Sequence, residues 1–315
     1  ELKFYKWEKE FKDKPYLRQP IGETWEEYTW GQVGDMARRL ASGLKSLNLR
    51  EGAHIGIYSK NCREWIISDL AIVMAGYVSV PFFPSLNGNE LSYIMDYGDV
   101  DALFIGKIET WDDIKDDLPN EMPIIRFPKY KGCSNVTKGY EWHEFINSNE
   151  PIENPHQPKL SDLWTIIFTS GTTGNPKGVM LTYQAIDGIK VVLDDPNNPL
   201  GIKHTGNNNF ISYLPLNHIF ERVVIEWCSF RYGGTISFVE SIETFGQNLK
   251  EVQPHVFAAA PRVWTKLQMG ILSKFSQKKL DNLLKIPLFS TILKKLIRKG
   301  LGFSRVRVTV SGSAP

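Results

Sequence analysis

The feature that most constrains this chain is the alternation of short, strand-like apolar runs with longer runs of helical periodicity. In the first third, the strand-like runs are 53–59, 78–82 and 102–105, and the helix-like runs are 62–77 and 89–97. Parallel strands need long crossover connections, so strands that are separated by helices favour a parallel sheet. The alternation resumes at residue 164 and continues to a last strand at 305–310. It predicts an α/β fold of stacked βαβ subdomains with mainly parallel sheets.

The periodicity weakens between residues 107 and 159, where Pro, Asn, Gly and charged residues are frequent. We expect an edge hairpin and a linker there. The predicted subdomains are therefore 1–155 and 156–315. At the start of the chain, Thr29 and Gln32 have the spacing of a capping box and predict that a helix begins after Thr29.

Charge and cysteine content exclude several classes of protein. The 315 residues carry a formal net charge of +2, which gives no electrostatic basis for a dedicated nucleic-acid binder. The three cysteines are far apart and predict neither a disulfide framework nor a metal site, as is typical of a cytoplasmic protein. No apolar run approaches the roughly 18 residues of a membrane span. The chain has no initiator Met and stops just after a strand, so we expect a fragment of a longer protein.

A glycine-rich loop follows the strand-like run 164–169, and the segment from Thr169 to Gly178 reads TSGTTGNPKG. Its glycines let backbone N–H groups approach an anion closely, and its hydroxyls and Lys177 add donors and positive charge. A polar turn would not require this combination, so we predict a phosphate site. The Walker pattern is absent, because Pro176 stands where that loop requires its second glycine.

This loop resembles the phosphate loop of the adenylate-forming superfamily, which includes acyl-CoA synthetases, luciferases and peptide-synthetase adenylation domains. The resemblance implies that the loop holds the β- and γ-phosphates of ATP while a carboxylate attacks the α-phosphate. It also implies a catalytic role for Lys177 and a position near Mg²⁺ for Thr169. The implied phosphate contacts are Thr169, Ser170, Gly171, Thr172, Thr173, Gly174 and Lys177.

A second motif spans Ser212 to Arg222 and reads SYLPLNHIFER. Taken alone, a histidine at a helix start is more often structural than catalytic. The segment resembles the LPLxH motif of the same superfamily, which implies that His218 is catalytic and lies where the acyl carboxylate, the adenylate and the CoA channel meet. Its continuation is similar to the long-chain fatty acyl-CoA synthetase branch. Some relatives have a gating Trp where this chain has Arg222, so the motif does not predict that gate, and Trp227 is an alternative candidate.

A third motif, VTVSGSAP, closes the chain. Small residues after a strand are common in turns, but they also leave room for a flat ring. The segment resembles the SG(A/S)AP stretch that runs along the adenine in the superfamily. The nucleotide contacts that it implies are Gly312, Ser313, Ala314 and Pro315.

Residues 266–299 form a basic amphipathic stretch, with nine Lys or Arg residues and one acid, Asp281, among Leu, Ile and Phe. Such a stretch can lie on an anionic membrane surface, and we expect a possible peripheral contact of this kind. The alternative is a helical pair that packs on its own domain with a solvated basic face.

The resemblance, over about residues 29–315, implies ATP-dependent activation of a fatty acid to an acyl-adenylate and then to acyl-CoA, with Mg²⁺. It also implies a C-terminal lid domain with a catalytic lysine. The chain stops before that domain, so we expect little or no ligase activity from the chain alone. Three alternatives stay open: an enzyme that adenylates another carboxylic acid, a conventional P-loop ATPase, and a non-catalytic nucleotide- or acyl-binding module.

Overall fold

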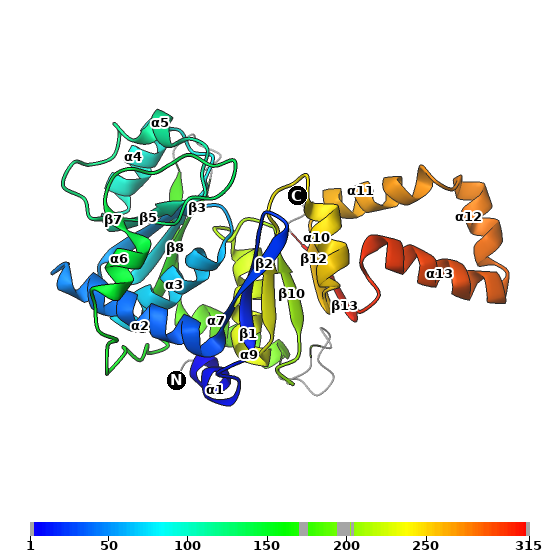
Figure 1. Cartoon of the computed structure of the whole chain (residues 1–315), viewed down its shortest axis with the longest axis horizontal. Coiled ribbons are helices and arrows are strands. Elements are labelled where there is room, and N and C mark those ends of the chain that lie inside the picture. The colour runs from blue at the N-terminus through cyan, green and yellow to red at the C-terminus, as the bar shows by residue number, and fades with distance from the viewer. Residues whose placement is uncertain (1–2, 170–175, 194–201, 203–204, 313–315) are drawn as a thin grey trace.

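The computed structural model describes residues 3–169, 176–193, 202 and 205–312 of the chain. These residues form two twisted sheets, with helices packed between and around them (Figure 1). Most neighbouring strands run parallel, and this confirms the predicted α/β class.

The seven-stranded sheet, sheet B, has the order β7-β6-β5-β3-β4-β8-β9. Its strands are β3 (His54–Ser59), β4 (Val78–Phe82), β5 (Val100–Gly106), β6 (Ile124–Arg126), β7 (Tyr140–Glu141), β8 (Leu163–Thr169) and β9 (Lys177–Thr182). Only β8 and β9 are antiparallel among the pairs of this sheet. The prediction of an edge hairpin before residue 159 was wrong, because β6 and β7 pair in parallel. The 13 residues between them carry the chain back along the sheet, so that β7 starts at the same end as β6.

The six-stranded sheet, sheet A, has the order β13-β12-β10-β11-β1-β2. Its strands are β1 (Pro15–Ile21), β2 (Thr24–Thr29), β10 (Asn209–Ser212), β11 (Thr235–Phe238), β12 (Val256–Ala259) and β13 (Val308–Ser311). Each sheet contains strands from both sides of the boundary that we expected near residue 155. The early hairpin β1–β2 joins sheet A, and the later strands β8 and β9 complete sheet B, so that boundary does not separate the two sheets.

Helix α2 (Trp30–Ser46) begins as the sequence predicts. Thr29 Oγ1 accepts from the N–H of Gln32 at 3.2 Å, and Gln32 Oε1 accepts from the N–H of Thr29 at 2.8 Å. Helix α3 (Arg63–Ala75) is buried on all sides, which explains its nearly continuous apolar sequence. The other helices around the sheets are α1 (Lys3–Glu10), α4 (Gly88–Tyr97), α5 (Trp111–Ile114), α6 (Trp142–Asn147), α7 (Tyr183–Leu193) and α10 (Phe245–Val252).

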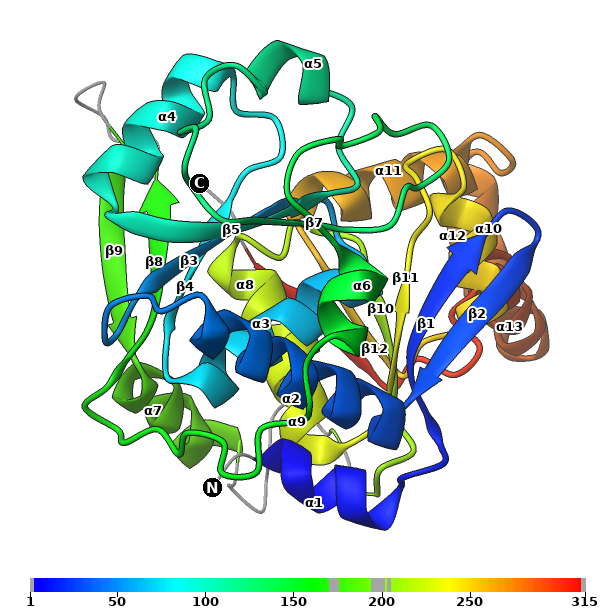
Figure 2. The same ribbon diagram turned by 60° about the vertical axis from the view of Figure 1, so that its left-hand side comes forward.

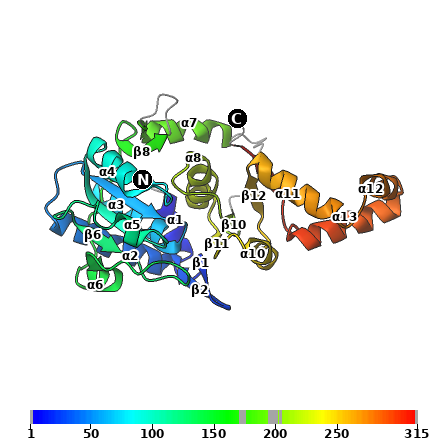
Figure 3. The same ribbon diagram turned by 90° about the horizontal axis from the view of Figure 1, so that it is seen from above.

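Two further helical segments matter for function. The first, which we call the buried column, runs from Ile219 to Tyr232 through α8 (Ile219–Glu221), the π-helical η1 (Arg222–Trp227) and α9 (Cys228–Tyr232). In Figure 3, α8 stands between α3 and the strands β10 to β12. The second, which we call the arm, contains α11 (Pro261–Leu272), α12 (Gln277–Leu284) and α13 (Pro287–Leu301), and it projects away from the sheets (Figures 1 and 3). No helix among the described residues is long and apolar enough to cross a membrane.

Candidate functional site

The glycine-rich loop connects two antiparallel strands of sheet B. Thr169, the last residue of β8, pairs with Lys177, the first residue of β9, and both are exposed. The sequence did not predict β9, but its pairing holds the two ends of the loop one strand spacing apart. Of the predicted phosphate contacts, Thr169 and Lys177 are therefore neighbours, and Ser170, Gly171, Thr172, Thr173 and Gly174 lie outside the described residues.

His218 caps the buried column and remains exposed. Its Nδ1 accepts a hydrogen bond from the N–H of Phe220 at 3.2 Å. A neutral imidazole that accepts at Nδ1 carries its proton on Nε2, so Nε2 can donate toward solvent or a ligand. This geometry is compatible with a role in the site as well as with capping.

Asn61 holds the segment that leads to His218, and sequence reasoning missed it. Its Nδ2 donates to Ser212 Oγ at 2.8 Å and to the carbonyl of Leu214 at 2.6 Å, and its Oδ1 accepts from the N–H of Leu216 at 3.0 Å. Asn61 lies just after β3, and its partners are the last residue of β10 and the segment that follows it, so this one amide ties sheet B to sheet A. A polar residue just after a predicted strand was the only signal in the sequence.

Glu221 lies within the same segment and is buried. Its Oε1 accepts from Ser212 Oγ at 2.9 Å and from the N–H of Tyr213 at 3.0 Å. Burial raises the pKa of Glu221 to about 8, and hydrogen bonds from Ser212, Tyr213 and Leu214 oppose that shift. This carboxyl group, three residues from His218, therefore ionises at a higher pH than a solvent-exposed glutamate.

Gly312 meets the His218 segment from the other side. Its N–H donates to the carbonyl of Ala259 at 3.3 Å, which places it at the carboxyl end of β12. A Cβ added to Gly312 would come within 2.4 Å of Phe220 Cε2, so only glycine fits against that ring without a shift. The predicted nucleotide contact Gly312 thus lies beside the residue that bonds His218, and Ser313, Ala314 and Pro315 lie outside the described residues.

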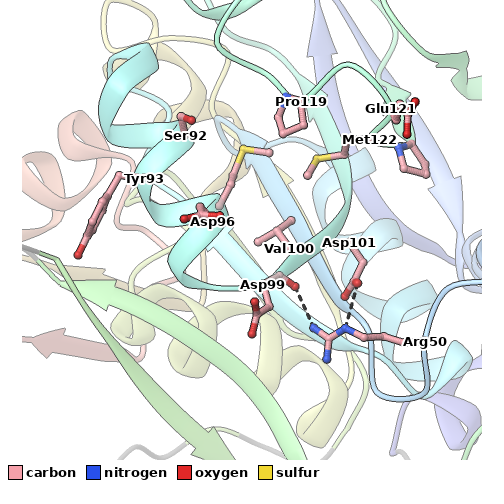
Figure 4. A pocket seen from close by; sticks show the side chains of 12 residues that line it. Arg50, Ser92, Tyr93, Asp96, Asp99, Val100, Asp101, Pro119, Glu121 and Met122 are labelled. Atoms are coloured by element: carbon pink, nitrogen blue, oxygen red, sulfur yellow. Dashed lines mark hydrogen bonds and ion pairs between the residues drawn. The ribbon is translucent and has the colours of Figure 1, made fainter.

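These contacts occur at the carboxyl ends of parallel strands, where ligands bind in open α/β sheets (Figure 2). A surface hollow of about 860 Å³ lies elsewhere. It is formed by α4, β5 and the loop at 119–123, and none of the predicted site residues lines it (Figure 4). There Arg50 donates to Asp101 Oδ1 and to the carbonyl of Asp99, both at 2.9 Å. Arg50 is therefore a structural residue that holds the loop before β5.

Comparisons with known proteins identify the family to which the chain belongs. The family model described as AMP-binding enzyme matches residues 4–315. Long chain acyl-CoA synthetase 4 of Arabidopsis thaliana is 30% identical over 329 residues, which cover 91% of this chain and 48% of that protein. The long-chain-fatty-acid–CoA ligase ACSBG2 of Rattus norvegicus is 28% identical over 271 residues, which cover 81% of this chain and 40% of that protein. The chain thus spans about half the length of the curated relatives that it matches.

Solved structures show the same fold at lower identity. The anthranilate CoA ligase AuaEII in complex with anthranoyl-AMP superposes with a TM-score of 0.74 at 19% identity, over 100% of this chain and 55% of that one. The A-PCP didomain of carboxylic acid reductase from Segniliparus rugosus, in complex with AMP, gives 0.75 at 19% identity, over 99% and 48%. With the family model matching nearly the whole chain, these likenesses lead to one assignment: the chain belongs to the AMP-binding enzyme family.

Proposed function

We propose that this chain is the N-terminal portion of a long-chain fatty acyl-CoA synthetase, with a C-terminal lid domain in the part of the protein that follows it. The reaction joins a fatty acid carboxylate to the α-phosphate of ATP and releases pyrophosphate. The thiol of CoA then attacks the acyl carbon of the adenylate and releases AMP. The observation that carries the proposal is the meeting of the His218 segment with Gly312 at the carboxyl ends of sheet A, in a chain whose relatives are named for this activity.

Each described residue has a role in this proposal that its position allows. The exposed Lys177 ammonium and Thr169 hydroxyl, side by side at the mouth of the loop, suit phosphate oxygens. His218 Nε2 would donate to the carboxylate or the adenylate. Gly312 would leave space along the adenine.

Magnesium fits this site as a companion of ATP. Among the described residues, no three His, Cys, Asp or Glu side chains lie together as a metal site. Mg²⁺ usually takes its ligands from substrate phosphates and water with one or two protein groups, and Thr169 can supply one oxygen. Bound Mg²⁺ would neutralise charge on the phosphates, while Lys177 and the loop orient them.

The test is fatty-acid-dependent exchange of labelled pyrophosphate into ATP, measured with the full-length protein and a panel of acids from short to long. We expect Lys177→Ala to lower the exchange about 100-fold, the loss typical of removing one electrostatic donor to the transition state. Lys131→Ala, which removes an exposed lysine remote from the loop, is the matched control and should exchange normally. The isolated 315-residue chain should show little or no exchange.

Other results would select the alternatives. Exchange with aryl or amino acids but not with fatty acids would indicate another carboxylic acid as substrate. Hydrolysis of ATP to ADP would indicate a P-loop type of ATPase. No exchange with any acid would contradict the ligase proposal and favour a binding module.

We further propose that the arm makes a peripheral contact with an anionic membrane, on the cytoplasmic side. Its helix α13 exposes Leu288, Phe289, Ile292 and Leu296, by 71%, 55%, 50% and 60%. Leu288, Ile292 and Leu296 follow one another at intervals of four and form one stripe of the helix, and Phe289 lies three positions before Ile292. Lys294, Lys295, Arg298 and Lys299 follow on the same helix, and a membrane with acidic lipids would match both the apolar and the basic side chains.

Vesicle sedimentation tests this contact. We expect binding to vesicles with 30% phosphatidylserine, about fivefold weaker binding for Lys295→Gln because one basic residue contributes about 1 kcal/mol, and weaker binding for Leu288→Ser. Leu160→Ser is the control, because Leu160 is 53% exposed but lies outside the arm. Equal binding of wild type and arm variants would contradict the contact. Self-association in light scattering, lost in Leu288→Ser, would indicate a second copy as the occupant of this face instead.

A further inference from the structure

Arg222 is a charged residue in an unusual place. It lies one turn after His218, and its N–H donates to the carbonyl of His218 at 3.3 Å. Its side chain is fully buried, so it does not reach the exposed surface on which His218 lies. A buried guanidinium costs free energy unless its donors are satisfied, and this one has partners on three elements.

The guanidinium joins the buried column to sheet B. Its Nη2 donates to both carboxylate oxygens of Asp69 on α3 at 2.7 Å, and its Nη1 donates to Thr165 Oγ1 on β8 at 2.8 Å. Its Nε donates to Glu226 Oε2, one turn further along the column, at 3.2 Å. The rings of Trp164 and Trp65 lie 4.1 and 5.3 Å from the guanidinium carbon. These contacts fix the planar group from every side.

Thr165 extends the connection toward the glycine-rich loop. Its hydroxyl accepts from Arg222 and donates to the carbonyl of Ser79 on β4 at 2.7 Å. Thr165 lies four residues before Thr169, where β8 ends and the loop begins. The same guanidinium thus contacts the strand that carries the loop and the helical column that begins at His218.

The cluster holds one guanidinium and two carboxyl groups, and all three are buried. Burial and the neighbouring carboxylate of Asp69 raise the pKa of Glu226 well above its usual range, and Arg222 opposes the shift. Buried ion pairs are often no more stable than apolar side chains of the same shape, so the stability of the core alone does not account for this arrangement.

We propose that Arg222 is a positioning residue, which through Thr165 fixes His218 relative to Thr169 at the end of β8 and so sets the geometry of the reacting groups. Its full burial keeps its side chain away from the surface on which ATP and the acid would bind. The inference rests on the proposed function, since it assigns to His218 and the loop their roles in adenylate formation. A displacement of about 1 Å between reacting groups is enough to lower a rate by up to 100-fold.

The most selective test uses Thr165, because Arg222 and Asp69 stay paired when it changes. In the full-length protein, Thr165→Val removes the hydroxyl with little change of shape, and Thr165→Ser keeps it. We expect Thr165→Val to lower kcat of pyrophosphate exchange about tenfold with KM for the fatty acid unchanged, and Thr165→Ser to restore most of the rate.

Arg222→Lys is the second variant, because lysine keeps the charge but lacks the fork that reaches three partners. We expect a loss of kcat of about tenfold or more. Arg38→Lys is its matched control: Arg38 makes a bidentate pair with Glu8 at 2.6 Å between α2 and α1, with no link to β8. Equal kcat values for Thr165→Val, Thr165→Ser and wild type would overturn the proposal.

Hydrogen exchange gives a readout that does not need catalysis. We expect Thr165→Val to speed amide exchange in peptides that cover β8 and in those that cover residues 216–222, whereas Thr165→Ser should not. If wild type forms no adenylate, the proposed function fails, and this measurement still decides whether the link exists. Faster exchange confined to β8 would show that Arg222 does not couple the two segments.

Discussion

The buried column and the arm are two helical segments that follow strands of sheet A, and they place their side chains in opposite ways. The column carries Glu221, Arg222 and Glu226 into the protein interior, whereas the arm leaves Leu288 and Phe289 in solvent. Charges inside and large apolar groups outside both depart from the usual distribution. Such departures are expected where function requires them. They favour a role for the column in positioning His218 and a role for the arm in contacting a membrane.

The largest effect should come from removing the positive charge of the column. Arg222→Met leaves Asp69 and Glu226 buried without their cation, and we expect the free energy of unfolding to fall by about 3–5 kcal/mol. Urea denaturation measures this loss. The matched variant Arg38→Met should lose less, because the Arg38 side chain keeps 25% of its surface in solvent. Similar losses in both variants would mean that the burial of the arginine does not determine how much free energy of unfolding is lost.

A second effect, of similar size when summed over the whole range, should appear as a pH dependence. The folded protein raises the pKa of Glu221 to about 8, so the native state holds a proton that the unfolded chain releases near its ordinary value. The stabilising contribution is complete below about pH 4.5 and is lost as the pH rises toward 8, at about 1.4 kcal/mol per pH unit.

The variant Glu221→Gln isolates this contribution, because glutamine does not titrate. We expect the stability of wild type to fall relative to that of the variant between about pH 5 and pH 8, in urea denaturation at several pH values. A constant difference across this range would show that Glu221 ionises in the folded protein as it does in water.

The smallest effect should come from the exposed face of the arm. Leu296→Ala on α13 should change the free energy of unfolding by less than about 0.5 kcal/mol, since Leu296 is 60% exposed. On the same helix Leu293 is 8% exposed, and Leu293→Ala should cost about 2 kcal/mol or more. Thermal or urea unfolding compares the two. A large loss in Leu296→Ala would mean that the exposed face packs on the protein itself.

Local patterns in the sequence were enough to predict much of the fold. The capping box at Thr29 and the strand at 78–82 agree with the structure because neighbouring residues determine them. Strand β9 was not predicted. Its sequence, KGVMLT, follows the loop directly and does not alternate between polar and apolar residues, and the burial of its residues does not alternate either. Helix α1 was missed because its charged sequence hides two buried aromatics, Phe4 and Trp7.

The candidate site was predictable only where it coincides with a motif. Lys177, His218 and Gly312 belong to segments that resemble known motifs. Glu221 and Arg222 belong to the same motif as His218, but the motif does not reveal which residues they contact, and Asn61, Asp69 and Thr165 lie in none of the motifs. Arg222 meets Thr165 and Asp69 across 57 and 153 residues of chain, and Asn61 meets Leu216 across 155. Contacts at this separation depend on the packing of the two sheets, and no local spacing reveals them.

The position of the early strands β1 and β2 in sheet A also affects the order in which the two sheets can fold. Strand β1 pairs in parallel with β11, with Leu17 opposite Ile236. This pairing joins two strands that are more than 200 residues apart in the chain. During synthesis, β1 and β2 therefore leave the ribosome as a hairpin without their neighbour. Long-range parallel pairings form slowly, because the intervening chain must close a large loop. Sheet A is thus expected to assemble after sheet B, and the hairpin is the segment that a chaperone would have to shield.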